Sequence, residues 1–221
     1  MNKKIVLAFF IGFMSFSSQA QAVMGNDNNT LLFKKSDRST ETIDGSQYTN
    51  DKYGSAKVNE GSEYYNIRYN NYKDVMEYEN NKKEILELIP DKNIVIEFAN
   101  GKNYYYKSYK NLKNEEISGY LSLISSSENV NFYSSNRIKY RPGKKASNSY
   151  ERDSSPAFYA DKTTYFIEIK GQVYQVSKTK DIEKMFQNKS SEVKKYFKDN
   201  GTNFSKENEI KKMIAFLNTI V

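Results

Sequence analysis

The side chains best suited to chemistry are concentrated between residues 68 and 77: Arg68, Tyr69, Asn70, Tyr72, Asp74 and Glu77. Two carboxylates can act as general acid and general base without histidine, as they do in glycoside hydrolysis. On a strand, residues three positions apart point to opposite faces, so Asp74 and Glu77 cooperate only if the chain bends between them. We therefore predict a turn aspartate and a solvated strand glutamate, with a carboxylate-dependent hydrolase as the alternative.

Five of these residues are candidates for a binding site: Arg68, Tyr69, Asn70, Tyr72 and Asp74. No residue is predicted to be catalytic, to bind a cofactor or to ligate a metal. The chain has no cysteine and no histidine, which excludes thiol nucleophiles, Ser-His-Asp arrangements and the commonest transition-metal ligand. It also lacks the glycine-rich phosphate loops and the zinc-binding helix motif. These absences favour a protein that is not an enzyme.

The elements that would position these residues are strands. Tyr65, Ile67 and Tyr69 alternate with polar residues, and Met76 and Tyr78 alternate again after a polar break at Asn70 and Asn71. This period of two predicts an antiparallel hairpin with its turn at residues 70–73, or one strand with a bulge there.

Further strand signals follow at short spacing. We predict strands at residues 93–99, 102–109, 119–125, 129–133, 137–140, 164–169 and 172–176, a strand or a short helix at 84–89, and loops at 112–118 and 141–156. Asn100 and Gly101 predict a type I′ hairpin turn, and Lys170 and Gly171 another tight turn. The composition of residues 141–156 favours disorder.

From Thr179 onward the apolar period becomes helical, as at Ile210, Met213, Ile214 and Leu217. Three amphipathic helices are predicted, with Ser190 and Ser205 as N-caps and Gly201 as a C-terminal glycine. Because the helices follow the strands, we predict an α+β fold: a curved or barrel-like antiparallel sheet (meander) followed by C-terminal helices.

We predict that this sheet occupies residues 63–176 and the helices 177–221, together forming a single domain at 63–221. Residues 23–62 are rich in Asn, Asp, Ser and Thr and predict a flexible polar leader with one short element at Leu31 to Phe33.

Residues 1–22 have the pattern of a secretory signal peptide, with Lys3 and Lys4 before an apolar run and Ala20 and Ala22 at its end. The run is too short to cross a membrane, and no transmembrane segment is expected in the mature chain. The mature chain is thus expected to be secreted or periplasmic and, without a cysteine after the signal, not a lipoprotein.

The formal net charge of +7 is mild for 221 residues, so no nucleic-acid partner is expected. The chain is rich in tyrosine, with 19 residues. Tyrosine suits a half-wet sheet face and can also stack on a sugar ring, so structural and binding roles both remain open.

The segment from Gly61 to Tyr78, with its Tyr-Asn, aromatic, Asp and Glu pattern, resembles a recurring pattern in secreted proteins of Bacteroidota. The resemblance extends through Tyr196 to Asn200 and the terminal helical region ending at Leu217 and Asn218. The family has no assigned activity, so the resemblance implies export but no catalytic residue.

The expected function is a secreted or periplasmic non-enzymatic module that binds a hydrophobic or glycan ligand. The alternatives are the carboxylate-dependent hydrolase and a protein-interaction domain that uses an edge strand or residues 141–156, with an envelope protein as partner.

Overall fold

A computed structural model describes residues 21–24, 31–36, 42–91, 94–148, 150 and 152–221. The predicted signal peptide lies almost wholly outside these residues. The strands are β1 (Gln21–Met24), β2 (Leu31–Lys35), β3 (Gly54–Val58), β4 (Tyr65–Asn70), β5 (Val75–Glu79), β6 (Ile85–Leu88), β7 (Val95–Phe98), β8 (Asn103–Lys110), β9 (Glu116–Ser126), β10 (Val130–Ser135), β11 (Ile138–Arg141), β12 (Ala157–Ala160), β13 (Thr164–Ile169) and β14 (Gln172–Val176). The helices are α1 (Thr179–Glu183), α2 (Ser190–Asn200) and α3 (Glu207–Ile220), with a short 3₁₀ turn between α1 and α2.

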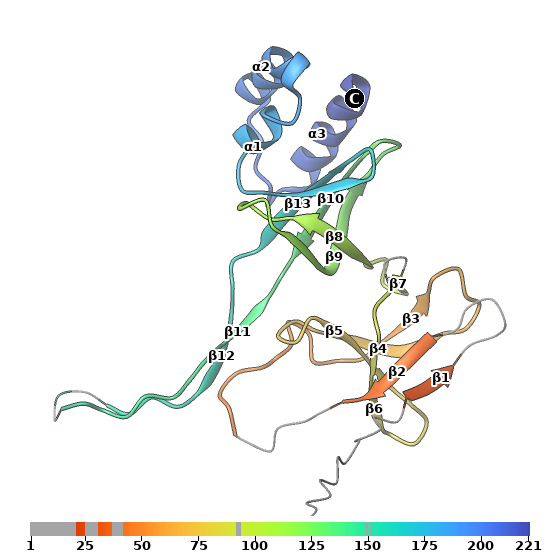
Figure 1. The fold of residues 1–221 in the computed structure, drawn as a ribbon, viewed down its shortest axis with the longest axis vertical. Coiled ribbons are helices and arrows are strands. Elements are labelled where there is room, and N and C mark those ends of the chain that lie inside the picture. The colour runs from red at the N-terminus through yellow and green to blue at the C-terminus, as the bar shows by residue number, and fades with distance from the viewer. Residues whose placement is uncertain (1–20, 25–30, 37–41, 92–93, 149, 151) are drawn as a thin grey trace, which may run out of the picture.

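The fold has two β-rich halves that share one continuous sheet (Figure 1). In one half the sheet runs in the order β1-β2-β6-β5-β4-β3-β7, and β7 continues into the other half by pairing with β8. There β8, β14, β13, β10 and β9 close into a five-stranded barrel, because β9 pairs back with β8. The predicted α+β class with a barrel-like antiparallel sheet and C-terminal helices is confirmed, and a single parallel pairing joins β14 to β8.

The hairpins form where the sequence predicts them, although one turn has a different geometry. At the turn between β13 and β14, both Lys170 and Gly171 have positive φ, as a type I′ turn requires. Between β7 and β8 only Gly101 has positive φ, and the Gly101 N–H donates to the Phe98 carbonyl. The prediction of a type I′ turn at Asn100 is therefore wrong: this is a longer loop that ends in a left-handed glycine.

The described residues form three apolar cores. The first fills the bent sheet of β2–β7 and includes Phe33, Ile67 and Ile96, each fully buried. The second lies between the outer face of the barrel and the helices, where Phe132 and Ile167 meet Met213. The third is inside the barrel and is mainly aromatic, so the barrel is a packed core rather than a pore.

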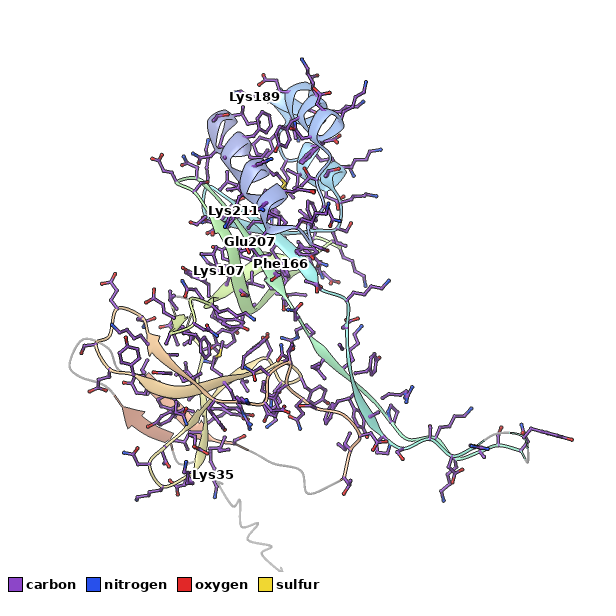
Figure 2. The ribbon with its side chains drawn as sticks, turned by 180° about the vertical axis from the view of Figure 1, so that it is seen from behind. Lys35, Lys107, Phe166, Lys189, Glu207 and Lys211 are labelled. Atoms are coloured by element: carbon purple, nitrogen blue, oxygen red, sulfur yellow. The ribbon has the colours of Figure 1, made fainter. Side chains whose placement is uncertain are left out.

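The barrel interior also holds a buried ion pair. Glu168 accepts hydrogen bonds from Tyr133 Oη at 2.5 Å and Asn131 Nδ2 at 3.0 Å, and Lys107 Nζ lies 3.0 Å from its carboxylate. Figure 2 labels Lys107 and Phe166 in this half of the molecule. The carboxylate is fully supplied with donors, which is the condition under which a buried charge is tolerated.

Four predictions about local structure need correction. The sheet begins before residue 63, because β3 lies within the predicted leader and pairs with both β4 and β7. The predicted loop at 112–118 includes the first residues of β9. Ser190 and Ser205 are not N-caps: Lys189 and Lys206 hold those positions and no side chain caps either helix.

Residues 141–156 are not a loop of the body. They extend the hairpin of β11 and β12, which is held farther out by a bridge between Lys144 and Ser154. The two strands form a sheet of their own and project away from both halves (Figure 1). Within the described part of the chain, no helix is long and apolar enough to cross a membrane.

Two buried tyrosines provide a matched stability test. Tyr133 donates to Glu168, whereas the Tyr120 hydroxyl is buried without a hydrogen-bond partner. We expect Tyr133→Phe to lower the free energy of unfolding by about 1–3 kcal/mol because it leaves a buried carboxylate short of a donor. Tyr120→Phe should leave that free energy unchanged or raise it. Denaturant unfolding at pH 7 measures the free energy of unfolding of both variants. Equal losses would contradict the claim that the Tyr133 hydroxyl stabilises the fold through Glu168.

Glu168 also predicts a pH dependence. Burial raises the pKa of this carboxyl, but the hydrogen bonds from Tyr133, Asn131 and Lys107 outweigh burial and hold the pKa below its usual value. A group with a lowered folded pKa stabilises the fold above its unfolded pKa of about 4.3, and this stability is lost as the pH falls through the folded pKa. The free-energy difference between the wild type and Glu168→Gln should thus be largest near pH 7 and shrink below about pH 4. The exposed Glu128→Gln serves as control, and a difference that is constant with pH would contradict the prediction.

Candidate functional site

The turn between β4 and β5 joins three parts of the molecule. Asn70 Oδ1 accepts hydrogen bonds from the backbone N–H groups of Tyr72 and Lys73, and Asp74 N–H donates to the Asn70 carbonyl. Asp74 closes the turn at a φ of +60°, a left-handed conformation that Asp and Asn tolerate better than most residues. The predicted hairpin with a turn at residues 70–73 is confirmed.

This conformation points Asp74 toward the barrel. Its Oδ1 accepts from Tyr69 Oη at 2.5 Å, from the Tyr120 N–H at 3.3 Å, and lies 2.6 Å from Arg137 Nη1. Burial, followed by the nearby Asp74 charge, raises the pKa of the Tyr69 phenol well above its usual value. The phenol therefore stays protonated and acts as a donor to Asp74.

Gly119 on β9 makes this approach possible. A Cβ atom at Gly119 would lie 2.5 Å from Asp74 Oδ2, closer than two atoms can approach without displacement.

Asp74 and Arg137 line one side of a cleft of about 250 Å³, and Tyr109, Gln175 and Ser135 are among its other lining residues. The cleft is smaller than the usual ligand pocket of about 300–1,000 Å³, and Asp74 is the sole carboxylate among the described residues that line it.

Arg68 belongs to a different cluster, on the other face of the hairpin. Its guanidinium lies over the rings of Tyr48 and Tyr53, with centroids at 3.9 and 4.4 Å, and its Nε and Nη2 donate to Glu77 Oε2 at 2.9 and 2.7 Å. Asn70 Nδ2 and Tyr48 Oη also donate to Glu77. These contacts fasten the segment around Tyr48 to the sheet.

The five candidate residues therefore divide into three groups. Tyr69 and Asp74 face the barrel, Arg68 and Asn70 bind Glu77, and Tyr72 packs against Phe158. Asp74 and Glu77 have separate partners and do not converge, so the described geometry provides no acid and base pair at this hairpin. Arg68 pairs with Glu77, and Asp74 pairs with Arg137.

Tyr72 lies at the base of the projecting hairpin, which we call the arm: residues 137–161 apart from 149 and 151. Its ring centroid lies 4.9 Å from that of Phe158 and 6.5 Å from that of Tyr140. Asn71 next to it donates from Nδ2 to the Asn136 carbonyl at 2.6 Å and accepts from the Ile138 N–H. One tight turn thus anchors the arm through both backbone and aromatic contacts.

The two faces of the arm differ. Tyr140 and Phe158 are paired across the strands and pack on Tyr72, so their face is turned to the body. The next pair, Lys139 and Tyr159, lies on the opposite face because side chains alternate along a strand. Tyr159 is 48% exposed, and Lys139 forms an ion pair with Asp161 at 2.7 Å.

Beyond this base the arm carries a series of exposed side chains: Arg141, Lys144, Lys145, Tyr150 and Arg152. Tyr150 is 100% exposed. Residues 137–161 contain six Lys and Arg against three Asp and Glu, a much higher cationic excess than in the chain as a whole. The arm therefore presents tyrosine and positive charge to the solvent.

The sequence predicts the first strand of the arm, at residues 137–140, but its continuation was missed because the composition of residues 141–156 resembles that of a disordered loop. The signal that could have revealed the partner strand is the apolar and aromatic pair Ala157 and Phe158, which matches the alternation of Ile138 and Tyr140. The roles of Arg137 and Gly119 depend on neighbours distant in sequence, so no local pattern could have found them.

Comparisons with known proteins give no match: no family model, no curated protein and no solved structure matches the chain.

The contact between Gly119 and Asp74 is testable by a double-mutant cycle. We expect Gly119→Ala to lower the free energy of unfolding by about 1–3 kcal/mol, since the added methyl group displaces Asp74 from Arg137 and Tyr69. In the background of Asp74→Gly, which tolerates the positive φ and removes the carboxylate, the same change should cost far less. Denaturant unfolding of the four proteins measures the coupling, and additive effects would show that the contact is not formed.

Proposed function

We propose that the protein is an exported, non-enzymatic interaction module that binds an acidic surface of a partner protein through the arm. The observation that supports this proposal is the arm itself: a two-stranded hairpin that leaves the body and exposes tyrosine and cationic side chains (Figure 1). Asp44 exchanges backbone hydrogen bonds with Pro156 and Phe158, and beyond this contact the described arm consists of two strands alone. Two strands alone are marginally stable in water, so this outer part of the hairpin requires a reason. Contact with a partner is such a reason.

The side-chain chemistry favours a protein partner. Tyrosine and arginine are enriched at protein interfaces, where they contribute a large part of the binding energy. The outer edge of β11 carries backbone groups with no strand beside them in the described part of the chain, and such an edge can pair with an extended segment of another protein. The excess of Lys and Arg adds electrostatic attraction to an acidic surface.

The rival functions receive less support. A hydrophobic ligand would need an apolar cavity, but Phe166, Tyr133 and the Lys107–Glu168 pair fill the barrel. A hydrolase would need two carboxylates about 5–10 Å apart in a cleft. In the cleft beside Asp74, the described lining contains one carboxylate, and Arg137 neutralises it.

Export is part of the proposal and is supported by the signal-like pattern of residues 1–22 and the resemblance to secreted Bacteroidota proteins. An exported chain with an arm fits a role in the cell envelope or outside the cell, in which the protein binds a partner and catalyses no reaction.

Site-specific photocrosslinking tests the proposal. A photoreactive phenylalanine analogue at Tyr150 or Tyr159 should produce a larger adduct in the native host, whereas the same analogue at Tyr64, which is 62% exposed on the body, should not. Arg141→Glu combined with Lys145→Glu should lower the adduct yield about tenfold, because charge reversal repels an acidic partner. The control is Lys198→Glu on α2, also exposed. Lack of an adduct at both arm positions, or an equal yield from Tyr64, would refute the assignment of the arm.

A further inference from the structure

Strand β9 changes its partner halfway along its length, and this leaves part of one edge open. Residues 116–122 pair with β8, and residues 122–126 pair with β10. β8 begins at Asn103, immediately after the turn at Gly101, where the chain comes from β7 in the other half of the molecule. From Leu123 to Ser126, β9 thus has a neighbour on one side only among the described residues.

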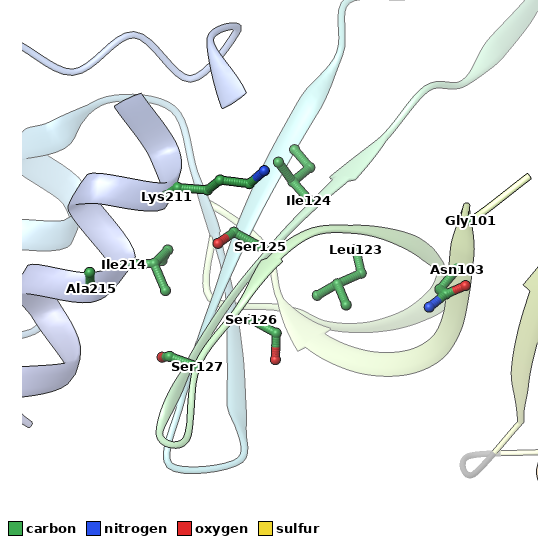
Figure 3. Close-up of a pocket in the computed structure, with 10 residues that line it drawn as sticks. All are labelled: Gly101, Asn103, Leu123, Ile124, Ser125, Ser126, Ser127, Lys211, Ile214 and Ala215. Carbon is green, nitrogen blue, oxygen red and sulfur yellow. The ribbon is translucent and has the colours of Figure 1, made fainter. Parts of the chain in front are cut away.

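Half of the backbone N–H and C=O groups of such a segment point away from its single neighbour. On that side lies a groove of about 460 Å³, larger than the cleft beside Asp74. Figure 3 shows its walls: the free edge of β9, α3 on one side, and Gly101 with Asn103 on the other. The groove is therefore bounded by a strand edge and a helix.

Helix α3 is fixed in place along this edge. Asn218 Oδ1 accepts hydrogen bonds from the Asn129 N–H at 2.9 Å and Ser127 Oγ at 3.2 Å, which ties the end of the helix to the turn between β9 and β10. One and two turns earlier, Ala215 and Lys211 line the groove. Ala215 lies next to Ile214 on the helix, and Lys211 projects toward the strand (Figure 3).

We infer that this groove binds an extended peptide, which adds to β9 as a further strand and directs a carboxylate to Lys211. Addition of a strand to an exposed sheet edge is a common mode of peptide recognition, in which main-chain hydrogen bonds provide affinity and neighbouring side chains provide specificity. The groove lies on the barrel and α3, not on the arm, so the inference is independent of the proposed function of the arm.

The dimensions and chemistry of the groove support this occupant. An open edge of four residues is about 13 Å long and pairs with a peptide segment of about the same length. Ala215 has a small side chain, and Ile214 and Ile124 beside it are apolar, so this part of the groove suits a small apolar residue of the peptide.

The positive charge of Lys211 favours a ligand with a negative charge. Lys211 Nζ lies 2.6 Å from Glu207 Oε1, but both side chains are more than half exposed. An exposed pair of this kind contributes little stability, so a peptide carboxylate can share or replace Glu207 at small cost. An acidic residue or a terminal carboxylate is therefore the expected polar feature of the peptide.

Panning a random heptapeptide display library on the wild-type protein tests the inference, with the Ala215→Trp variant used for subtraction. Trp at this exposed helical position fills the groove without disturbing the core. We expect peptides with a carboxylate and without central proline to be enriched. A selected peptide should bind Ala215→Trp at least about tenfold more weakly, since the bulky ring occupies its place. Methylation of alternate peptide nitrogens should abolish binding because it removes the main-chain donors.

Two adjacent lysines form a matched control for charge. Lys211→Glu should weaken binding of the selected peptide about three- to tenfold, whereas Lys212→Glu, equally exposed but outside the groove, should leave it within about twofold. Equal effects of the two changes would refute the role of Lys211. The inference would be overturned if no selected peptide preferred the wild type over Ala215→Trp. It would also be overturned if the wild type formed a concentration-dependent dimer that Ala215→Trp dissociates, because the groove would then bind a second copy of the chain.

Discussion

The structure depends on one carboxylate. Asp74 occupies a left-handed turn position and collects donors from its own strand, from β9 and from the start of the arm: Tyr69, Tyr120 N–H and Arg137. Because the interaction is partly buried and charge-assisted, its loss would leave an uncompensated cation at the junction.

Other buried carboxylates of the molecule are also paired with Lys or Arg side chains. Glu77 is held by Arg68, Glu168 by Lys107, and Glu87 by Lys73 and Lys34. Phenol hydroxyls supply further donors, as Tyr48 does to Glu77 and Tyr133 to Glu168. Part of the tyrosine content thus has a structural explanation: the rings of Tyr48, Tyr69 and Tyr133 add apolar bulk, and their hydroxyls donate to carboxylates in a chain without disulfides.

The two surfaces that we propose for binding lie where regular strand pairing ends. The arm leaves the barrel between β10 and β13, and the groove beside α3 opens where β8 departs to join β7. In both places a strand lacks a neighbour on one side among the described residues, so its backbone edge and nearby polar side chains are exposed. This location separates the two proposed binding surfaces from the packed cores, and the cores hold these surfaces in position.

The sequence by itself determined the hairpins, the amphipathic helices and the α+β class, because these follow from local periodicity and turn residues such as those at Asn70 and Gly171. It could not determine that β3 joins the sheet, that residues 141–156 extend an arm, or that Asp74 meets Arg137 and not Arg68. Those outcomes depend on contacts between residues that are far apart in the chain, 63 positions in the case of Asp74 and Arg137. Only the tertiary structure decides them, since local preferences in a polar segment are weak and long-range packing and ion pairing override them.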